Sequence, residues 1–395
     1  AHRASGRPGA WSRLARSIMR HPVAYLVVAG GLMIGLALPA LGLHLTGGDN
    51  RGVPLTKEAT RGLALLRSTL GPGALSPNQI AIDSGRPGGA YSPRVVAAER
   101  RLVAELRRDP RVNRSTIVSP LMLPAGPRGR ALAARNSLVD RSGQVAQIRA
   151  SARADWGTKA AQSLVHRIRG SYIPRARFGD ARVILTGAPA FGVDFIETAY
   201  GAFPWLVLAV LVLSYLLLLR AFRSLLLPLK AVILNLLSVC ATYGVLVLVF
   251  LHGGHELLGL DGLPQIEAWI PIFLFAMLFG LSMDYEVFLL SRIREEWEKR
   301  HDNEEAVAYG LEHTGRIITA AALIMIAAFS GFTAGSFVGL QEFGIGLSAA
   351  ILLDATVVRA ILVPALMKLL GDWNWYLPKR VERLLDRTRV MTASR

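Results

Sequence analysis

The stretch WIPIFLFAMLFGLSMDYEVFLLS, residues 269–291, decides the fold, because it is an apolar run of membrane-spanning length with a carboxylate inside it. About 20 apolar residues cross the hydrocarbon core of a bilayer as a helix. An ionised Asp284 at that depth is costly unless it is paired or hydrated. We therefore expect Asp284 to face a polar interior and not lipid.

The neighbours of Asp284 favour a functional role for its carboxylate. Gly280 lies one turn earlier on the same helical face, where the absent side chain lets another helix or water approach. Tyr285 adds a hydroxyl at the same level. A buried carboxyl with such neighbours can bind and release a proton, so Asp284 and Tyr285 are predicted to form a proton relay. The alternative is a carboxylate that only ties two helices together. Glu286 is nearer the helix end, and we expect it to be solvated or interfacial.

The composition indicates a membrane protein with a sizeable aqueous domain. The 395 residues are 52% hydrophobic and carry a net charge of +17. Such a chain is too apolar for an ordinary soluble domain and too charged to lie wholly in a bilayer. The basic residues are mostly scattered, so no nucleic-acid partner is predicted. A single cysteine, Cys240, excludes an intramolecular disulfide. Because the first residue is Ala1, we expect an excised or truncated piece of a longer protein.

The apolar runs predict a polytopic α-helical membrane protein with six transmembrane helices and one extracytoplasmic, porter-like α+β domain between the first and second. The predicted parts are a basic leader (1–22), a first span (23–43), the α+β domain (44–197), a five-helix bundle (198–371) and a basic tail (372–395). The bundle spans are placed at about 202–219, 231–251, 269–291, 317–335 and 343–370. Lys and Arg near span ends stay cytoplasmic. The loops 252–268 and 336–342 contain neither residue, so both termini are predicted to be cytoplasmic.

The α+β domain is predicted from alternating and helical patterns. Helices are expected at 56–70, 94–108 and 158–173, and strands at 79–83, 116–119, 137–139, 145–150 and 182–186. The domain contains no nucleophile elbow, phosphate loop or metal-ligand cluster. We therefore predict a binding or conduit element with no enzyme activity, no cofactor and no metal.

A second polar pair lies in the last span. Asp354 should sit at a depth similar to that of Asp284, because both helices run in the same direction. Arg359 follows five residues later, about 140° further round an α-helix, so the two should find partners on other helices. We predict a shared polar layer supported by Asp354, Arg359, Gly280, Ser282 and Asn235.

Several motifs resemble one family. Residues 280–297, GLSMDYEVFLLSRIREEW, resemble a span of the MMPL family of the resistance-nodulation-division (RND) superfamily, and residues 354–359 (DATVVR), 362–365 (LVPA) and 369–375 (LLGDWNW) are similar to the end of the same repeat. The likeness covers residues 17–378 and is strong in the spans but weak in the α+β domain.

The resemblance implies proton-driven export (efflux) of lipids, drugs or other amphipathic small molecules across a bacterial plasma (inner) membrane. In that family the Asp-Tyr pair, here Asp284 and Tyr285, is the proton relay, and the late Asp and Arg fall on Asp354 and Arg359. Members usually have two repeats, and this chain looks like the C-terminal one. The missing N-terminal repeat, or a second copy, would bring a facing Asp-Tyr pair.

Two alternatives remain at the level of sequence. One is a protein-translocation accessory of the SecD/SecF type, which shares six spans and a large domain after the first. Tyr285, Ser291 and the Asn374-Trp375 pair favour the MMPL family. The other is a lipid sensor or scaffold that keeps the fold without pumping. Proton flux separates it from a transporter.

Overall fold

The computed structural model describes residues 10–48, 58–260, 262, 265–379 and 381–382. The first part of the predicted leader, most of the predicted tail and the start of the helix expected at 56–70 lie outside these residues. The chain divides into two compact units, a helical one (Ala1–His44 and Ala202–Arg395) and a mixed one (Leu45–Gly201).

Six helices among the described residues are long and apolar enough to cross a membrane, which confirms a polytopic helical protein. In chain order they are α2 (Pro22–Ala37) continued by η1 (Leu38–Gly42), α8 (Ala188–Phe222), α9 (Leu226–Leu246) continued by η8 (Val247–Leu251), α11 (Trp269–Arg300), α12 (Asn303–Ser330) continued by η9 (Gly331–Ala334), and α13 (Val338–Leu353) continued by η10 (Asp354–Leu362), α14 (Val363–Leu370) and η11 (Gly371–Trp375).

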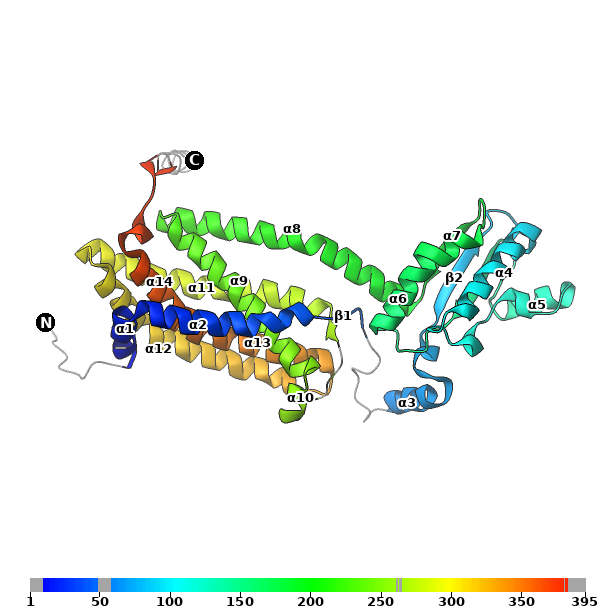
Figure 1. The fold of residues 1–395 in the computed structure, drawn as a ribbon, viewed down its shortest axis with the longest axis horizontal. Coiled ribbons are helices and arrows are strands. Elements are labelled where there is room, and N and C mark those ends of the chain that lie inside the picture. Colours follow the sequence, from blue (N-terminus) through cyan, green and yellow to red (C-terminus); the bar gives the residue numbers. More distant parts are fainter. Residues whose placement is uncertain (1–9, 49–57, 261, 263–264, 380, 383–395) are drawn as a thin grey trace. The chain divides into compact units, whose positions relative to one another are not determined.

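The helices of the membrane-spanning unit pack side by side. α11 packs against α12, α13 and α9, while α2 packs along α9 (Figure 1). Close approach depends on small residues: a Cβ added to Gly244 of α9 would lie 1.7 Å from the carbonyl oxygen of Leu36. Gly346 of α13 is packed against the Leu274 side chain in the same way. Small residues at helix contacts are how membrane bundles gain packing energy.

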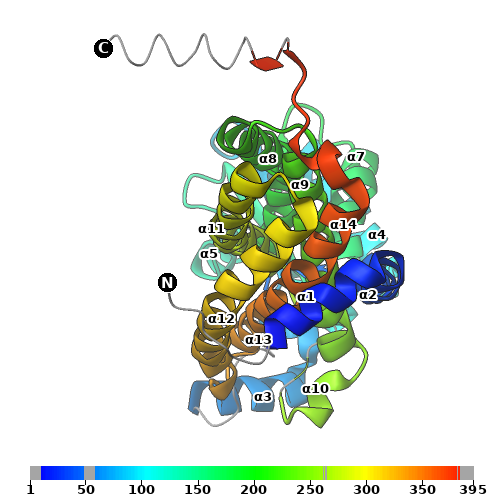
Figure 2. The same cartoon turned by 90° about the vertical axis from the view of Figure 1, so that its left-hand side faces the viewer.

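One end of this bundle carries the charged connections. The amphipathic helix α1 (Ala10–Arg20) packs on α12 and α14 and buries Ala15 and Ile18 (Figure 2). α11 ends at Arg300, and α12 starts where the Asp302 side chain accepts hydrogen bonds from the backbone of the next turn. Both helices therefore extend well past the apolar runs predicted at 269–291 and 317–335. Short elements α10 (Gly254–Leu257) and β5 (Ile266–Glu267) lie between α9 and α11 in the sequence.

The mixed unit contains a three-stranded antiparallel sheet in the order β3-β2-β4. Its strands are β2 (Asn78–Asp83), β3 (Val145–Ala150) and β4 (Arg182–Thr186), with Ile80 of β2 opposite Ile148 and Leu185. The other elements are β1 (Leu45–Thr46), α3 (Glu58–Leu70), η3 (Pro72–Leu75), η4 (Gly89–Tyr91), α4 (Pro93–Arg108), η5 (Arg114–Thr116), η6 (Pro120–Met122), α5 (Pro127–Arg135), α6 (Lys159–Arg167), η7 (Ile168–Tyr172) and α7 (Ile173–Ala176).

Two of the predicted strands in this unit are wrong. Residues 116–119 and 137–139 each form a single bridge, Val118 to Arg149 and Val139 to Ala146. Pro120, which has no N–H to donate, follows the first segment. Ser137 opens the second with a φ of 54°, a left-handed conformation that cannot continue a strand. The remaining strands and helix α4 bury a shared apolar core, as the alternation along β2 predicts.

Candidate functional site

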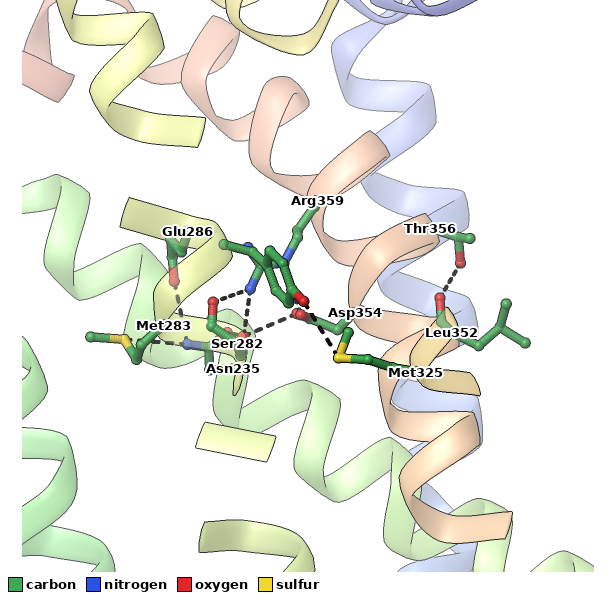
Figure 3. Close-up of polar contacts among 10 residues, drawn as sticks. Asn235, Ser282, Met283, Glu286, Met325, Leu352, Asp354, Thr356 and Arg359 are labelled. Carbon is green, nitrogen blue, oxygen red and sulfur yellow. Dashed lines mark hydrogen bonds and ion pairs between the residues drawn. The ribbon is translucent and has the colours of Figure 1, made fainter. Parts of the chain in front are cut away.

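The membrane-spanning unit holds a buried ion pair between Asp354 and Arg359 (Figure 3). Arg359 Nε lies 2.8 Å from Asp354 Oδ2, and the two side chains are only 4% and 7% exposed. The prediction that these residues lie too far apart round the helix is wrong. Residues 354–362 form the π-helix η10, whose hydrogen bonds join residues five apart, so the two side chains stack on one face.

Ser282 of α11 joins the ion pair to two other helices. Its hydroxyl accepts a hydrogen bond from Arg359 Nη2 at 2.8 Å, and Arg359 also donates to the Ser282 carbonyl. The same hydroxyl lies 2.7 Å from Asn235 Oδ1 and 3.2 Å from Asp354 Oδ1, either of which can accept its proton (Figure 3). The predicted members Ser282, Asn235, Asp354 and Arg359 therefore meet in one buried layer.

Glu286 also belongs to this layer, contrary to the interfacial position predicted for it. Its side chain is buried, and Oε2 accepts a hydrogen bond from Asn235 Nδ2 at 3.3 Å (Figure 3). Glu286 follows Ser282 by four residues, so it continues the inward face of α11 that also buries Leu289 and Ile293. The position of Glu286 round the helix, and not its nearness to the helix end, therefore decides that the side chain is buried.

Tyr285 covers the open side of the ion pair. Its ring centroid lies 5.4 Å from Arg359 Cζ, within cation–π range, and its hydroxyl donates to Met325 Sδ of α12 at 3.4 Å. Tyr285, Asp354, Arg359 and Ser282 line a cavity of about 10 Å³. That volume is close to what one water molecule requires, and Arg359 Nη1 is a buried donor with no partner among the described residues.

Asp284 does not join this layer within the described chain. Its side chain is exposed, as is Gly280 one turn earlier, and a Cβ added to Gly280 would meet nothing within 4 Å. Asp284 follows Ser282 by two residues, which places it about 3 Å further along α11 but on another face. Asp284 and Asp354 thus lie close to one level along the bundle, while the face around Asp284 is left uncovered by the residues that the structure describes.

Lys230 is a further buried charge, and it is not among the residues predicted for the polar layer. It lies on α9, is 6% exposed, and its Nζ is 3.4 Å from Asn374 Oδ1 of η11. The signal that could have found it is the match of Lys230 and Asn374 to family motifs, combined with helical phase.

The layer contains two acids, Asp354 and Glu286, and one base, Arg359, in the interior of a membrane-spanning unit. Buried carboxylates beside cations and a water-sized cavity can exchange protons, and each protonation changes the balance of charge. No group of three or more His, Cys, Asp or Glu side chains in the described ranges could hold a metal ion. The arrangement defines a polytopic membrane protein with a buried charged layer, the class in which ion-coupled transporters fall.

Comparison with known proteins identifies the family. The model of the MMPL family matches residues 58–391. The chain is 33% identical over 375 residues to the mycolic acid-containing lipids exporter MmpL11 of Mycolicibacterium smegmatis, covering 95% of this chain and 37% of the relative. It is 35% identical over 377 residues to the heme uptake protein MmpL11 of Mycobacterium tuberculosis (95% and 36%) and 41% identical over 206 residues to the trehalose monomycolate exporter MmpL3 of that organism (52% and 22%).

The chain therefore belongs to the MMPL family of RND-superfamily membrane transporters. It spans about a third of the length of the MmpL11 relatives that it matches. Family and relatives are multi-pass bacterial membrane transporters, in agreement with the six candidate spans.

Proposed function

We propose that this chain is one repeat of a two-repeat, proton-driven exporter of lipids or other hydrophobic and amphipathic compounds. The observation that carries the proposal is the buried layer in which Asp354, Arg359, Ser282, Asn235 and Glu286 join α9, α11 and η10. Two relatives are named as lipid exporters, which supports a lipid substrate class. Membership of the MMPL family favours a small-molecule transporter over a protein-translocation accessory.

The proposed cycle begins when a proton adds to Asp354. Neutral Asp354 leaves the Arg359 guanidinium without a counter-charge in a buried site, which is strongly unfavourable. The helices then shift until Arg359 finds another acceptor, and Glu286, which already shares Asn235 with the layer, is the nearest second carboxylate along the hydrogen bonds. A proton entering down a potential of 100 mV supplies roughly 2.3 kcal/mol for this change.

Asp284 and Tyr285 are proposed to complete the relay with a second repeat or a second copy of the chain. Tyr285 contacts both the ion pair and α12, while Asp284 lies on the uncovered face two residues away. An exposed carboxylate at mid-span is tolerated only if a polar partner covers it. A facing repeat that brings its own polar groups would satisfy Asp284. The absence of two-thirds of the relatives' length from this chain leaves room for such a repeat.

Orientation follows from the basic loops. Both termini and the turn at Asp302 are proposed to be cytoplasmic, and the mixed unit extracytoplasmic, in a bacterial plasma membrane. Protons would then enter from the end at which α11 begins.

The test is substrate-coupled proton flux through the full-length protein reconstituted in liposomes. Asp354→Asn is expected to abolish proton uptake and lipid export together. Asp372→Asn, a matched change at an exposed position of η11, should leave both unchanged. Export that persists in D354N would refute the relay, and a wild-type protein without proton flux would indicate a sensor or scaffold.

A further inference from the structure

A second pair of buried carboxyl groups lies at the other end of the bundle, where α11 and α13 begin. Glu267, in β5, and Glu342, in the second turn of α13, are 7% and 0% exposed. The backbone N–H of Glu267 donates to Glu342 Oε2 at 3.0 Å. Neither residue has a role predicted from the sequence, because Glu267 falls in a loop and Glu342 at the start of an apolar run.

The Glu267 carboxylate is well stabilised. Trp269 Nε1 donates to its Oε2 at 2.5 Å. The carboxyl group also lies over the first turn of α13, since a Cβ added to Gly339 would be 2.8 Å from its carboxyl carbon. Negative charge is favourable at a helix N-terminus because the backbone N–H groups there are free. Glu267 can therefore remain ionised although it is buried.

Glu342 is only half satisfied. Its Oε1 is buried and has no hydrogen-bond partner in the part of the chain that the structure describes. Gln265, two residues before Glu267 and 4% exposed, likewise carries a buried Oε1 acceptor with no donor among the described residues. Leaving such acceptors unpaired in a buried site is unfavourable, and more so for a charged group. Two acceptors short of a donor in one small region point to a bound donor.

The charged surroundings of Glu342 favour a proton as that donor. Glu267 of β5 presents its carboxylate to Glu342. His44, whose carbonyl accepts from Ile266, turns its Nδ1 toward its own neighbour Leu43. No ion pair to Glu342 occurs within the described residues, so its nearest charge is negative.

Glu342 is separate from the Asp354 layer although both lie on the last span. The two residues are twelve positions apart, so Glu342 lies about 18 Å from Asp354 along the helix axis. Gly346 between them is packed against Leu274, and Ala350 is fully buried in an apolar cluster. A proton cannot pass along this closed contact until the helices move.

We propose that Glu342, held by the backbone of Glu267, is a second proton-binding site, which accepts a proton before the Asp354 layer does. In this step a hydronium ion gives its proton to Glu342 Oε1, a new O–H bond forms, the carboxylate becomes neutral and water is left. Only the order of the two sites rests on the proposed function. The binding of the proton itself does not.

Infrared difference spectroscopy of the full-length protein in lipid nanodiscs tests this site. With glutamate labelled by ¹³C at the side-chain carboxyl, only protonated Glu groups give an isotope-shifted carboxylic C=O band. The test is made in an E99Q background, because burial raises the pKa of Glu99 to about 7 and Glu99 would add a band of its own. In that background the otherwise unchanged protein is expected to show a band, E342Q to lose it, and the matched surface change E256Q to retain it, since Glu256 is exposed in α10. A band that is unchanged in E342Q, or absent from the otherwise unchanged protein, would overturn the proposal.

A second variant protects the test against misfolding of E342Q. Glu267→Gln preserves shape but removes the neighbouring charge, so the band should remain and its titration midpoint should move by about one pH unit. An unmoved midpoint would contradict the proposed pairing. D354N separates the two proposals: it is expected to lose export and keep this band, whereas failure of the proposed function would leave export intact in D354N whatever the band does.

Discussion

Arg359 pairs with Asp354, five residues earlier on the same helix, because the backbone between them is π-helical and not α-helical. In a regular α-helix the two side chains would diverge by about 140°. The π-helix replaces the hydrogen bonds of a regular α-helix by bonds between residues five apart, and such segments are frequent at functional sites. Here it places a base and an acid side by side, where both also reach Ser282 of α11.

Replacing only one member of the Asp354–Arg359 pair should destabilise the protein more than replacing both. Arg359→Met leaves a buried, uncompensated carboxylate and is expected to cost about 3–5 kcal/mol of stability. The double variant D354L/R359M should recover most of that loss, because no charge remains buried. Thermal unfolding in detergent measures both. Equal instability of the single and double variants would contradict a buried, coupled pair, and the double variant is expected to be inactive in export.

Glu286 should prove essential in spite of its position near the helix end. Glu286→Gln removes a buried charge that accepts from Asn235, an interaction worth about 1.5–3 kcal/mol, so export should fall by about tenfold or more. Glu298→Gln, about three turns further along α11 at an exposed position, provides the control. Export should stay within about twofold of wild type, since the pair of Glu298 with Arg294 is exposed. Export rates of the two variants in liposomes decide between a buried and an interfacial role.

The uncovered face of α11 gives a third prediction. Gly280→Leu places a side chain where nothing lies within 4 Å, so the chain should fold normally but lose export if another repeat covers this face. Gly31→Leu, equally open on α2, should preserve both folding and export. Gly310→Leu should impair folding, because its Cβ would lie 2.3 Å from Ile293. Active G280L protein would show that no partner packs against this face.

In the mixed unit, Glu99 predicts a pH dependence of stability. Burial raises the pKa of Glu99 to about 7, and the hydrogen bond from Ser119 Oγ lowers it only partly. The folded state therefore holds a proton that the unfolded state releases above its own pKa of 4.5. Stability should fall by about 3 kcal/mol as the pH rises from 4.5 to 7 and then level off. Hydrogen exchange of α4 measures this, and E99Q should remove the slope.

Asp109 in the same unit predicts a pH dependence of stability opposite to that of Glu99, with stability lost at low pH. Burial alone would raise the pKa of Asp109, but hydrogen bonds from Arg111 and Tyr172 outweigh it and hold the pKa at about 2. This stabilisation is complete above pH 3.8, the ordinary pKa of Asp, and is lost as the pH falls toward 2. Asp109→Asn should therefore weaken hydrogen-exchange protection of α4 at neutral pH and have little effect near pH 2. Equal effects at both values would contradict the assignment.

The sequence predicts much of the fold, since apolar length and the alternation along β2 and β3 depend on residues close together in the chain. It also groups Ser282, Asn235, Asp354 and Arg359 into one layer. Prediction from the sequence fails where the backbone departs from a regular α-helix, and where the position of a residue round the helix decides whether it is buried. Nothing in the local sequence indicates the π-helix that begins at Asp354. Glu286 is predicted to be interfacial from its place near the helix end, whereas its four-residue spacing from Ser282 indicates burial on the same face. Glu342 is missed because its partner Glu267 is distant in the sequence.

The most direct test of the central claim measures proton uptake and lipid export together in liposomes that contain the full-length protein. The account predicts that D354N loses both activities while D372N retains both, and that wild-type export stops when the proton gradient is collapsed. Export in D354N at the wild-type rate, or wild-type export that ignores the gradient, would show that the buried Asp354–Arg359 layer does not drive transport.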